Sequence, residues 1–270
     1  MIARLISANS SELLKMNGDE LKQSIKASEG RTVLSENVVI QPAIDGLTMS
    51  EIAATFGADL ILLNLFDVFK PKVSGLEVKD AKDTVKRLKE LIGRPIGVNL
   101  EPVDPDVKIE SAKFELPKGR IATAESMRRA EELGFNFVCF TGNPGSDVTN
   151  KMIVQAVRTA KENFSGMIIA GKMHGAGVDE PVADEESVKA MIDAGADVIL
   201  VPAVGTVPGF TSDELIKIVK IVVMSTIGTS QESSGKDVIR EIALKNKMSI
   251  SNISGTPHGA CCLQQRLSLN

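Results

Sequence analysis

Short apolar runs recur along this chain, and longer amphipathic segments separate them. Runs of this kind are typical of parallel strands that are buried on both faces, with helices between them. Such runs predict strands at residues 32–40, 59–65, 95–101, 136–142, 166–172, 197–203, 221–228 and 248–255. Eight strands with intervening helices favour an α/β fold of the TIM (β/α)8 barrel type over an open doubly wound sheet, which usually has fewer strands.

The helix ends support repeated βα units. Two predicted helices lead into similar segments, FGADLILLN at 56–64 and AGADVILVP at 194–202. In each segment a glycine ends the helix, a short turn follows, and an apolar strand begins. Another predicted helix begins after Thr48, which is a good N-cap residue.

The 270 residues predict one domain, with an N-terminal helical cap at 1–30, the barrel at 31–255 and a short tail at 256–270. The cap is expected to cover the N-terminal face of the barrel. The tail is long enough for about two helical turns, so the eighth helix is predicted to be truncated. That side of the barrel is then thinly covered, which favours a homo-oligomer.

Charge and composition exclude several kinds of partner. The formal net charge is −4, the charges are interspersed, and both Trp and Tyr are absent, which argues against nucleic acid and anionic membranes. No apolar run approaches the roughly 20 residues of a membrane-spanning helix, and the first residues lack the layout of a signal peptide. Three cysteines without metal-site spacing agree with a reducing, cytoplasmic location.

Polar residues follow several predicted strands at the point where each strand ends. In a (β/α)8 barrel these ends converge on one mouth, where active sites are found. The residues concerned include Glu36, Asn64, Asp67, Asn99, Glu101, Lys172 and His174. We predict Asn64 and Asn99 as substrate-binding residues, and Glu36 or Glu101 as a proton shuttle.

Lys172 is the first candidate catalytic residue, because it follows an apolar strand directly. A lysine between apolar walls has a lowered pKa, and its neutral amine can form a Schiff base or act as a base. Neighbouring carboxylates such as Glu36 or Glu101 would instead keep it charged, and it could then bind a phosphate or carboxylate. A third alternative is a lysine that only pairs with an internal carboxylate.

His174 is predicted as a general acid or base, or as a metal ligand, with a loop histidine of no catalytic role as the alternative. A divalent metal such as Mg²⁺ is the one cofactor that the sequence suggests. Its oxygen-rich site would draw on Glu36, Asp67, Glu101 and His174, although these residues show no diagnostic spacing.

A phosphate-binding site is predicted in the loop after the seventh strand, at Gly228, Thr229 and Ser230. Gly255, after the eighth strand, is predicted to form its second half. Glycine lets the backbone approach an anion closely, and many barrels bind phosphate at this position. The acidic segment 179–187 is predicted to be a solvated loop that leads into a helix with an acidic first turn.

The segments LISANSSELLKMN, SIKASEGRTVLSENVV, FGADLILLNLFDVF, PIGVNLEP, AGKMH and TIGTSQE together resemble an uncharacterised bacterial family of TIM-barrel proteins. Some of its members are named haloacid dehalogenase-like hydrolase or phosphoenolpyruvate phosphonomutase. The dehalogenase name is not carried over, because the aspartyl nucleophile motif is missing here. A fainter likeness, through PIGVNL and FVCFTGNPGSDVTNKMI, links the chain to the barrel family associated with photosystem I biogenesis. That likeness implies a phosphate-binding barrel.

The chain departs from the main family at its end, where SGTPHGACC stands in place of GDAG and a longer helical tail. Three functions follow as expectations. The first is an aldolase, lyase or isomerase that acts on a small phosphorylated or carboxylated metabolite. The second is a metal-assisted phosphonomutase or lyase, and the third is a non-catalytic barrel that binds a metabolite or supports assembly.

Overall fold

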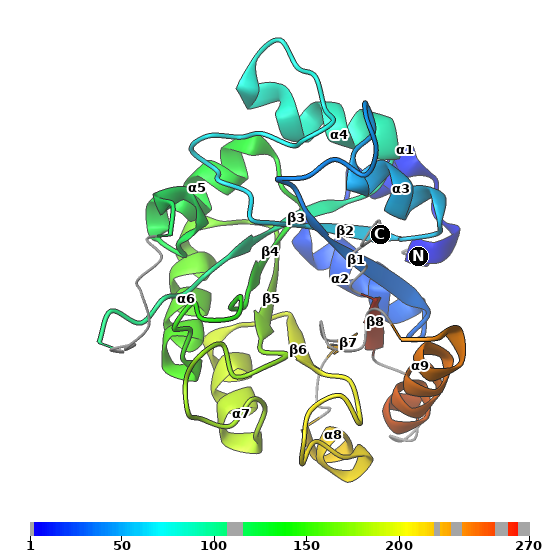
Figure 1. Cartoon of the computed structure of the whole chain (residues 1–270), viewed down its shortest axis with the longest axis vertical. Coiled ribbons are helices and arrows are strands. Elements are labelled where there is room, and N and C mark those ends of the chain that lie inside the picture. Colours follow the sequence, from blue (N-terminus) through cyan, green and yellow to red (C-terminus); the bar gives the residue numbers. More distant parts are fainter. Residues whose placement is uncertain (1–2, 107–115, 219–221, 228–233, 252–258, 264–270) are drawn as a thin grey trace.

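The computed structural model describes residues 3–106, 116–218, 222–227, 234–251 and 259–263 of the chain (Figure 1). Eight parallel strands close into a barrel in sequence order, because β8 pairs with β1. The strands are β1 (Thr32–Val38), β2 (Leu60–Asn64), β3 (Ile96–Leu100), β4 (Phe137–Phe140), β5 (Met167–Gly171), β6 (Val198–Pro202), β7 (Val222–Ile227) and β8 (Gly259–Leu263). The predicted (β/α)8 fold is therefore confirmed.

Helices surround the strands on the outside of the barrel (Figure 1). They are α1 (Ser10–Leu13), α2 (Gly18–Ala27), α3 (Met49–Thr55), α4 (Thr84–Ile92), α5 (Ala124–Leu133), α6 (Asn150–Asn163), α7 (Glu185–Ala194), α8 (Ser212–Ile218) and α9 (Lys236–Ser251). Among the described residues, no helix is long and apolar enough to cross a membrane.

The helix ends follow the sequence signals. Thr48 caps α3 by accepting a hydrogen bond from the Glu51 amide, as predicted. Gly93 and Gly195 lie in the left-handed region at the ends of α4 and α7, where a side chain would be strained.

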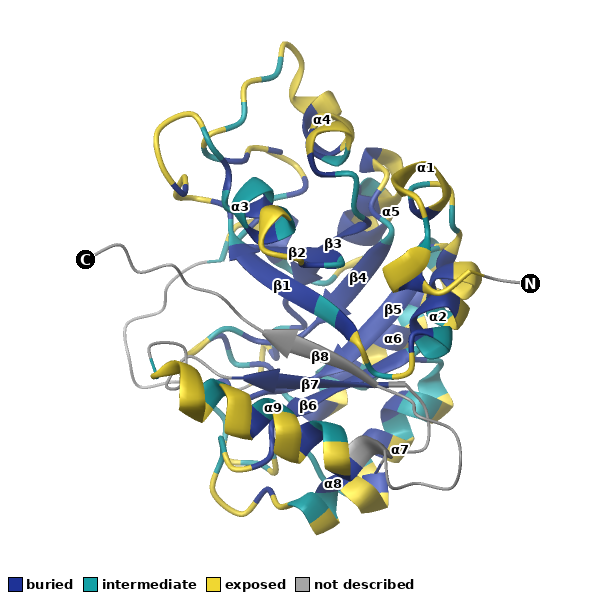
Figure 2. Cartoon of the chain, turned by 90° about the vertical axis from the view of Figure 1, so that its right-hand side faces the viewer, coloured by how far each residue is buried: buried dark blue, intermediate teal, exposed yellow. Residues whose placement is uncertain are grey.

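The apolar residues form two main layers. One lies between the strands and the outer helices, and the other fills the inside of the barrel together with residues of α2 such as Leu21 and Ile25. A Cβ on Gly18 would lie 2.6 Å from the Gly166 carbonyl carbon, so only glycine lets α2 approach β5 this closely. Figure 2 shows the result, with buried strands and helices that are exposed on their outer faces.

The position predicted for the eighth strand is wrong. Residues 248–251 continue α9, and the last strand lies at Gly259–Leu263, inside the segment predicted as a tail. The buried side chains of Ile242, Asn246 and Ser249 have helical spacing, whereas Met248 is 63% exposed. An apolar residue on the outer face of a helix therefore looked like the start of a strand. The truncated helix is predicted within the tail 256–270, which holds β8 instead, and residues 252–258 and 264–270 lie outside the described residues.

Candidate functional site

Polar side chains form a layer inside the barrel, towards the carboxyl ends of the strands. Leu34, Leu62, Cys139 and Met224 belong to the apolar cluster inside the barrel. Since side chains alternate along a strand, the residue two positions further along also faces inwards. These residues are Glu36, Asn64, Thr141 and Thr226, and all are buried. Two of the predicted site residues, Glu36 and Asn64, therefore face the barrel interior.

Asn99 joins this layer from β3. A Cβ on Gly97 would collide with the ring of Phe137, which lies inside the barrel, so Gly97 and therefore Asn99 face inwards. The Asn99 side-chain amide donates to Asn64 Oδ1 at 3.3 Å. Asn64 and Asn99, both predicted to bind substrate, are therefore in contact.

The orientation of these amides is fixed by a backbone donor. Leu65 has a φ of 61° and donates its backbone N–H to Asn64 Oδ1 at 2.8 Å. An N–H can only donate, so the oxygen of Asn64 must face it, and Asn99 must offer its nitrogen to the same oxygen. The side-chain oxygen of Asn99 can then accept a hydrogen bond or bind a cation.

Three buried oxygens of this layer lack a hydrogen-bond partner within the part of the chain that the structure describes. They are Asn99 Oδ1, Thr141 Oγ1 and Thr226 Oγ1, from β3, β4 and β7. Buried polar atoms are almost always paired, so unpaired ones call for a water, an ion or a ligand. These oxygens mark the barrel mouth as the candidate site.

Glu101 lies directly after β3 and is only 1% exposed. Its Oε1 accepts a hydrogen bond from Arg120 Nη2 at 2.5 Å, and its Oε2 accepts from the Asn143 backbone N–H at 3.2 Å. Arg120 ends the short 3-10 helix η3 (Lys118–Arg120). Both oxygens of Glu101 are engaged, so this carboxylate holds the loops after β3 and β4 together.

The charge of Glu36 acts across the barrel interior. Burial and then the nearby Glu36 raise the pKa of the Cys139 thiol well above its usual value. β1 and β4 are not neighbours in the sheet, so this interaction crosses the barrel. Cys139 is therefore a protonated thiol at neutral pH.

Lys172 lies on the other side of β5. Ile168 and Ala170 belong to the cluster between strands and helices, and Lys172 follows them at the same two-residue spacing. Its ammonium is 1% exposed, pairs with Glu180 Oε1 at 2.6 Å and donates to the Val148 carbonyl at 3.2 Å. This geometry matches the third alternative, a lysine paired with an internal carboxylate, and does not support Schiff-base chemistry.

The acidic segment before α7 is only partly as predicted. Asp184 caps the helix, and Glu185 and Glu186 form its acidic first turn, as expected. Glu180, in contrast, is not a solvated loop residue, because its carboxylate binds Lys172. No periodic spacing links Lys172 and Glu180 along the chain.

The four predicted metal ligands do not come together. His174 Nδ1 accepts the Ala176 N–H at 3.0 Å, and burial followed by the charge of Lys172 lowers the pKa of His174. Asp67 Oδ1 accepts the backbone N–H groups of Phe69 and Lys70. In the described residues, no three or more His, Cys, Asp and Glu side chains are grouped to hold a metal. The predicted phosphate-binding residues Gly228, Thr229, Ser230 and Gly255 lie outside the described residues.

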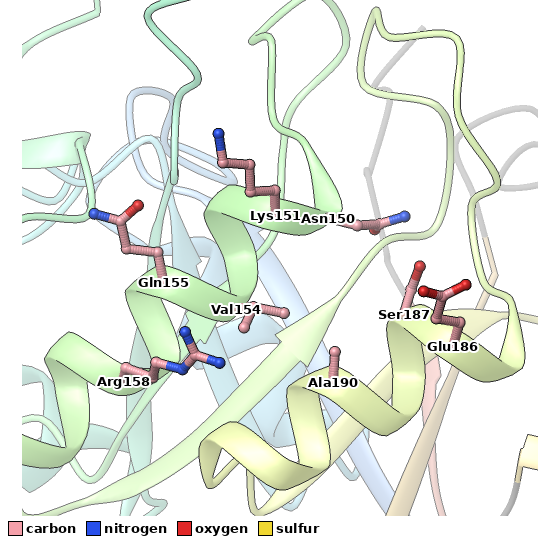
Figure 3. A pocket seen from close by; sticks show the side chains of 8 residues that line it. All are labelled: Asn150, Lys151, Val154, Gln155, Arg158, Glu186, Ser187 and Ala190. Atoms are coloured by element: carbon pink, nitrogen blue, oxygen red, sulfur yellow. The ribbon is translucent and has the colours of Figure 1, made fainter.

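A surface pocket of about 410 Å³ lies between α6 and α7 (Figure 3). Its lining includes Lys151 and Arg158 from α6 and Ser187 and Ala190 from α7. None of the predicted site residues lines it. The pocket is a groove in the helical layer and does not contain the polar layer of the barrel mouth.

Residues 6–255 match the family described as a domain of unknown function (DUF7916). The chain belongs to the DUF7916 family. A search of curated proteins found no match to this DUF7916 chain.

Solved structures share the fold of this DUF7916 chain. A putative lyase/mutase from Burkholderia cenocepacia J2315 aligns with a TM-score of 0.52 and 14% identity, over 90% of this chain and 80% of that one. The 2,3-dimethylmalate lyase, a PEP mutase/isocitrate lyase superfamily member, gives 0.55 and 11%, over 91% and 79%. Phosphonopyruvate hydrolase in complex with oxalate and Mg²⁺ gives 0.50 and 13%, over 90% and 80%.

At these identities the similarity shows the fold alone. The three neighbours are named as a putative lyase/mutase, a lyase of the PEP mutase/isocitrate lyase superfamily and a phosphonopyruvate hydrolase, which agrees with the phosphonomutase part of the sequence resemblance. None of these three structures carries a dehalogenase or photosystem name.

Proposed function

We propose that this DUF7916 protein is an enzyme that binds a small carboxylate or phosphonate in its barrel mouth and performs lyase or mutase chemistry on it with a divalent metal such as Mg²⁺. The observation that carries the proposal is the set of buried oxygens of Asn99, Thr141 and Thr226, which have no hydrogen-bond partner among the described residues. The solved neighbours include a 2,3-dimethylmalate lyase, and a phosphonopyruvate hydrolase bound to oxalate and Mg²⁺. In (β/α)8 barrels active sites lie at the carboxyl ends of the strands, which is where these oxygens are found.

The charges near the strand ends favour a metal. Arg120 and Lys172 are each paired with a glutamate, so their charge is already offset. An anionic ligand that enters beside Glu101, whose charge Arg120 already offsets, is stabilised by a further positive charge. A divalent metal supplies that charge.

The oxygen donors of the mouth fit Mg²⁺. This ion prefers oxygen ligands, keeps several waters, and is usually held by one or two carboxylates together with the substrate. The side-chain oxygen of Asn99 would hold it directly and Glu36 only through water, so that this carboxylate stays free to exchange a proton, and the four-residue cluster predicted from the sequence is not required. When bound, the metal would polarise an oxygen of the substrate.

The protein side chains would orient the substrate and move its proton. The hydroxyls of Thr141 and Thr226 each have a hydrogen to donate to a carboxylate or phosphonate oxygen. Glu36 is a buried carboxylate that faces the interior and would carry a proton to and from the reacting carbon or hydroxyl. Glu101 would keep the Asn143 loop in place through its bond to the Asn143 N–H.

Product formation tests this proposal. Purified protein with Mg²⁺ is incubated with 2,3-dimethylmalate and with phosphonopyruvate, and new carboxylates or phosphate are followed by ¹H and ³¹P NMR. We expect turnover of at least one acid, lost at least a hundredfold in Glu36→Gln because a positioned proton shuttle contributes about 10²-fold or more. The matched control is Lys189→Met, which removes an exposed ion pair on α7. No turnover of either acid, or equal rates in Glu36→Gln and the control, would contradict the proposal.

A further inference from the structure

The Lys172–Glu180 ion pair sits where two loops of the barrel mouth meet. Glu180 Oε1 accepts two short hydrogen bonds, from Lys172 Nζ and from the Asn150 backbone N–H, each at 2.6 Å. Asn150 is the first residue of α6, where the helix dipole favours a carboxylate. The ammonium also donates to the Val148 carbonyl, one residue before the N-cap of α6. One ion pair therefore joins the end of β5, the start of α6 and the loop before α7.

Other contacts join the same two loops. The Asp147 N–H donates to the Ala176 carbonyl at 3.1 Å, and Asn150 Nδ2 donates to the Pro181 carbonyl at 2.9 Å. A Cβ on Gly142 would lie 2.8 Å from that of Ala176, so the two loops also touch where the first one begins. The loop after β4 (141–149) and the loop after β5 (172–184) thus pack as one unit.

The first of these loops carries Asn143 into the barrel mouth. Asn143 donates its backbone N–H to Glu101 and pairs with Asn64 through both side-chain amides. Asn64 Oδ1 in turn accepts a hydrogen bond from the Asn99 amide, and the Asn99 oxygen has no partner in the described part of the chain. The position of the 141–149 loop therefore bears on the geometry of the candidate site.

We propose that Lys172 and Glu180 are positioning residues, which hold the 141–149 loop so that Asn143 reaches Asn64 and Glu101. A fully buried ammonium is costly to desolvate, and a buried ion pair is often no more stabilising than apolar residues of the same size. Its contribution is then the fixed geometry of the two loops. The consequence for ligand binding rests on the proposed function, whereas the consequence for the loop does not.

Amide hydrogen exchange measured by NMR tests the loop directly. The probes are the amides of Asn143 and Asp147, whose hydrogen bonds cross from this loop to Glu101 and Ala176. In Lys172→Met we expect both amides to exchange at least tenfold faster than in the wild type. Glu180→Gln is the second variant. The Glu180 side chain is 25% exposed, so its replacement should lower the free energy of unfolding less than Lys172→Met does. Should Lys172→Met fail to fold, the same tenfold criterion is applied to Glu180→Gln.

Two controls separate positioning from general destabilisation. Lys189→Met removes an exposed pair on α7, and Val85→Ala opens a cavity in the helical layer on α4, away from the two loops. Exchange at Asn143 and Asp147 should stay at the wild-type rate in Lys189→Met. In Val85→Ala it should rise less than in Lys172→Met at matched global stability. Combining Lys172→Met with Glu180→Gln should add less than twofold, because both changes break one pair.

A ligand titration in the same variants links the loop to the site. If wild-type protein binds oxalate in the presence of Mg²⁺, we expect at least tenfold weaker binding in Lys172→Met and Glu180→Gln. If the wild type binds no oxalate, the proposed function fails, and the exchange data still decide the loop. Wild-type exchange rates at Asn143 and Asp147 in a folded variant that lacks the pair would overturn the positioning role.

Discussion

Asn64 and Asn143 exchange two hydrogen bonds through their side-chain amides, at 2.9 and 3.2 Å. One residue ends β2, and the other lies in the loop after β4, so the pair bridges over β3. Asn99 of β3 donates to the same Asn64 oxygen. The three amides form one hydrogen-bonded network, and the orientation of each follows from the Leu65 N–H.

Removing the centre of this network should destabilise the fold. Asn64→Ala leaves the buried Asn99 amide and the partly buried Leu65 N–H without their acceptor, and we expect the free energy of unfolding to fall by about 1–3 kcal/mol. Urea denaturation measures the change. Gln155→Ala on the exposed face of α6 is the control and should stay within about 0.5 kcal/mol of the wild type. Equal stability of the two variants would mean that the network does not hold the mouth together.

The Arg120–Glu101 pair should show strong coupling. Arg120→Met leaves a carboxylate that is 1% exposed without its cation, which we expect to cost about 3–5 kcal/mol. Adding Glu101→Gln removes the uncompensated charge, so the double variant should be more stable than Arg120→Met alone. Urea denaturation of all four proteins gives the coupling energy. Additive losses would show that the two side chains act independently.

Gly97 should tolerate no side chain. A Cβ there would lie 2.2 Å from the Phe137 ring, so we expect Gly97→Ala to cost about 1–3 kcal/mol through overpacking. Phe137→Leu in the same protein should recover part of that loss, because it removes the colliding atoms. The control is Gly235→Ala, where no atom of the described residues lies within 4 Å of the added Cβ. Stability is measured by thermal or urea unfolding. If Gly97→Ala is as stable as the control, this packing is contradicted.

Stability should increase with pH through the titration of Lys89. Burial lowers the pKa of this amine from 10.5 to about 8, so between these values the unfolded chain binds more protons than the folded protein. The free energy of unfolding then rises with pH, by at most about 1.4 kcal/mol per pH unit for one proton. Lys89→Met should lack this increment, whereas Lys86→Met on the exposed face of α4 should keep it. Identical pH slopes in the two variants, from urea unfolding at pH 7.5 to 10, would rule out the shift.

Much of the fold could be predicted because buried parallel strands leave a clear apolar pattern. Seven of the strands lie within the predicted ranges, and the glycine and threonine signals mark real helix ends. The eighth strand could not be placed, because Met248 is apolar and yet lies on the exposed face of α9. The segment GACCL that forms β8 is too short and too small in its side chains to stand out from a loop.

The site was predictable only as far as strand geometry determines it. Glu36, Asn64, Asn99 and Glu101 were expected at the carboxyl ends of strands, and all four are buried there. The direction of Lys172 was not evident, because one residue of register decides whether a side chain faces the interior or the helices. Its partner Glu180 comes from a loop, and loop contacts leave no periodic signal in the sequence.

Calorimetric titration of oxalate decides whether the barrel mouth binds a ligand. With Mg²⁺ present, we expect saturable binding to the wild type, and at least tenfold weaker binding, about 1.4 kcal/mol, in Asn99→Ala and in Thr226→Val. Without Mg²⁺ the heat should match the buffer blank. Heat at the blank level with Mg²⁺, or equal affinity of the wild type and both variants, would contradict a ligand site at the barrel mouth.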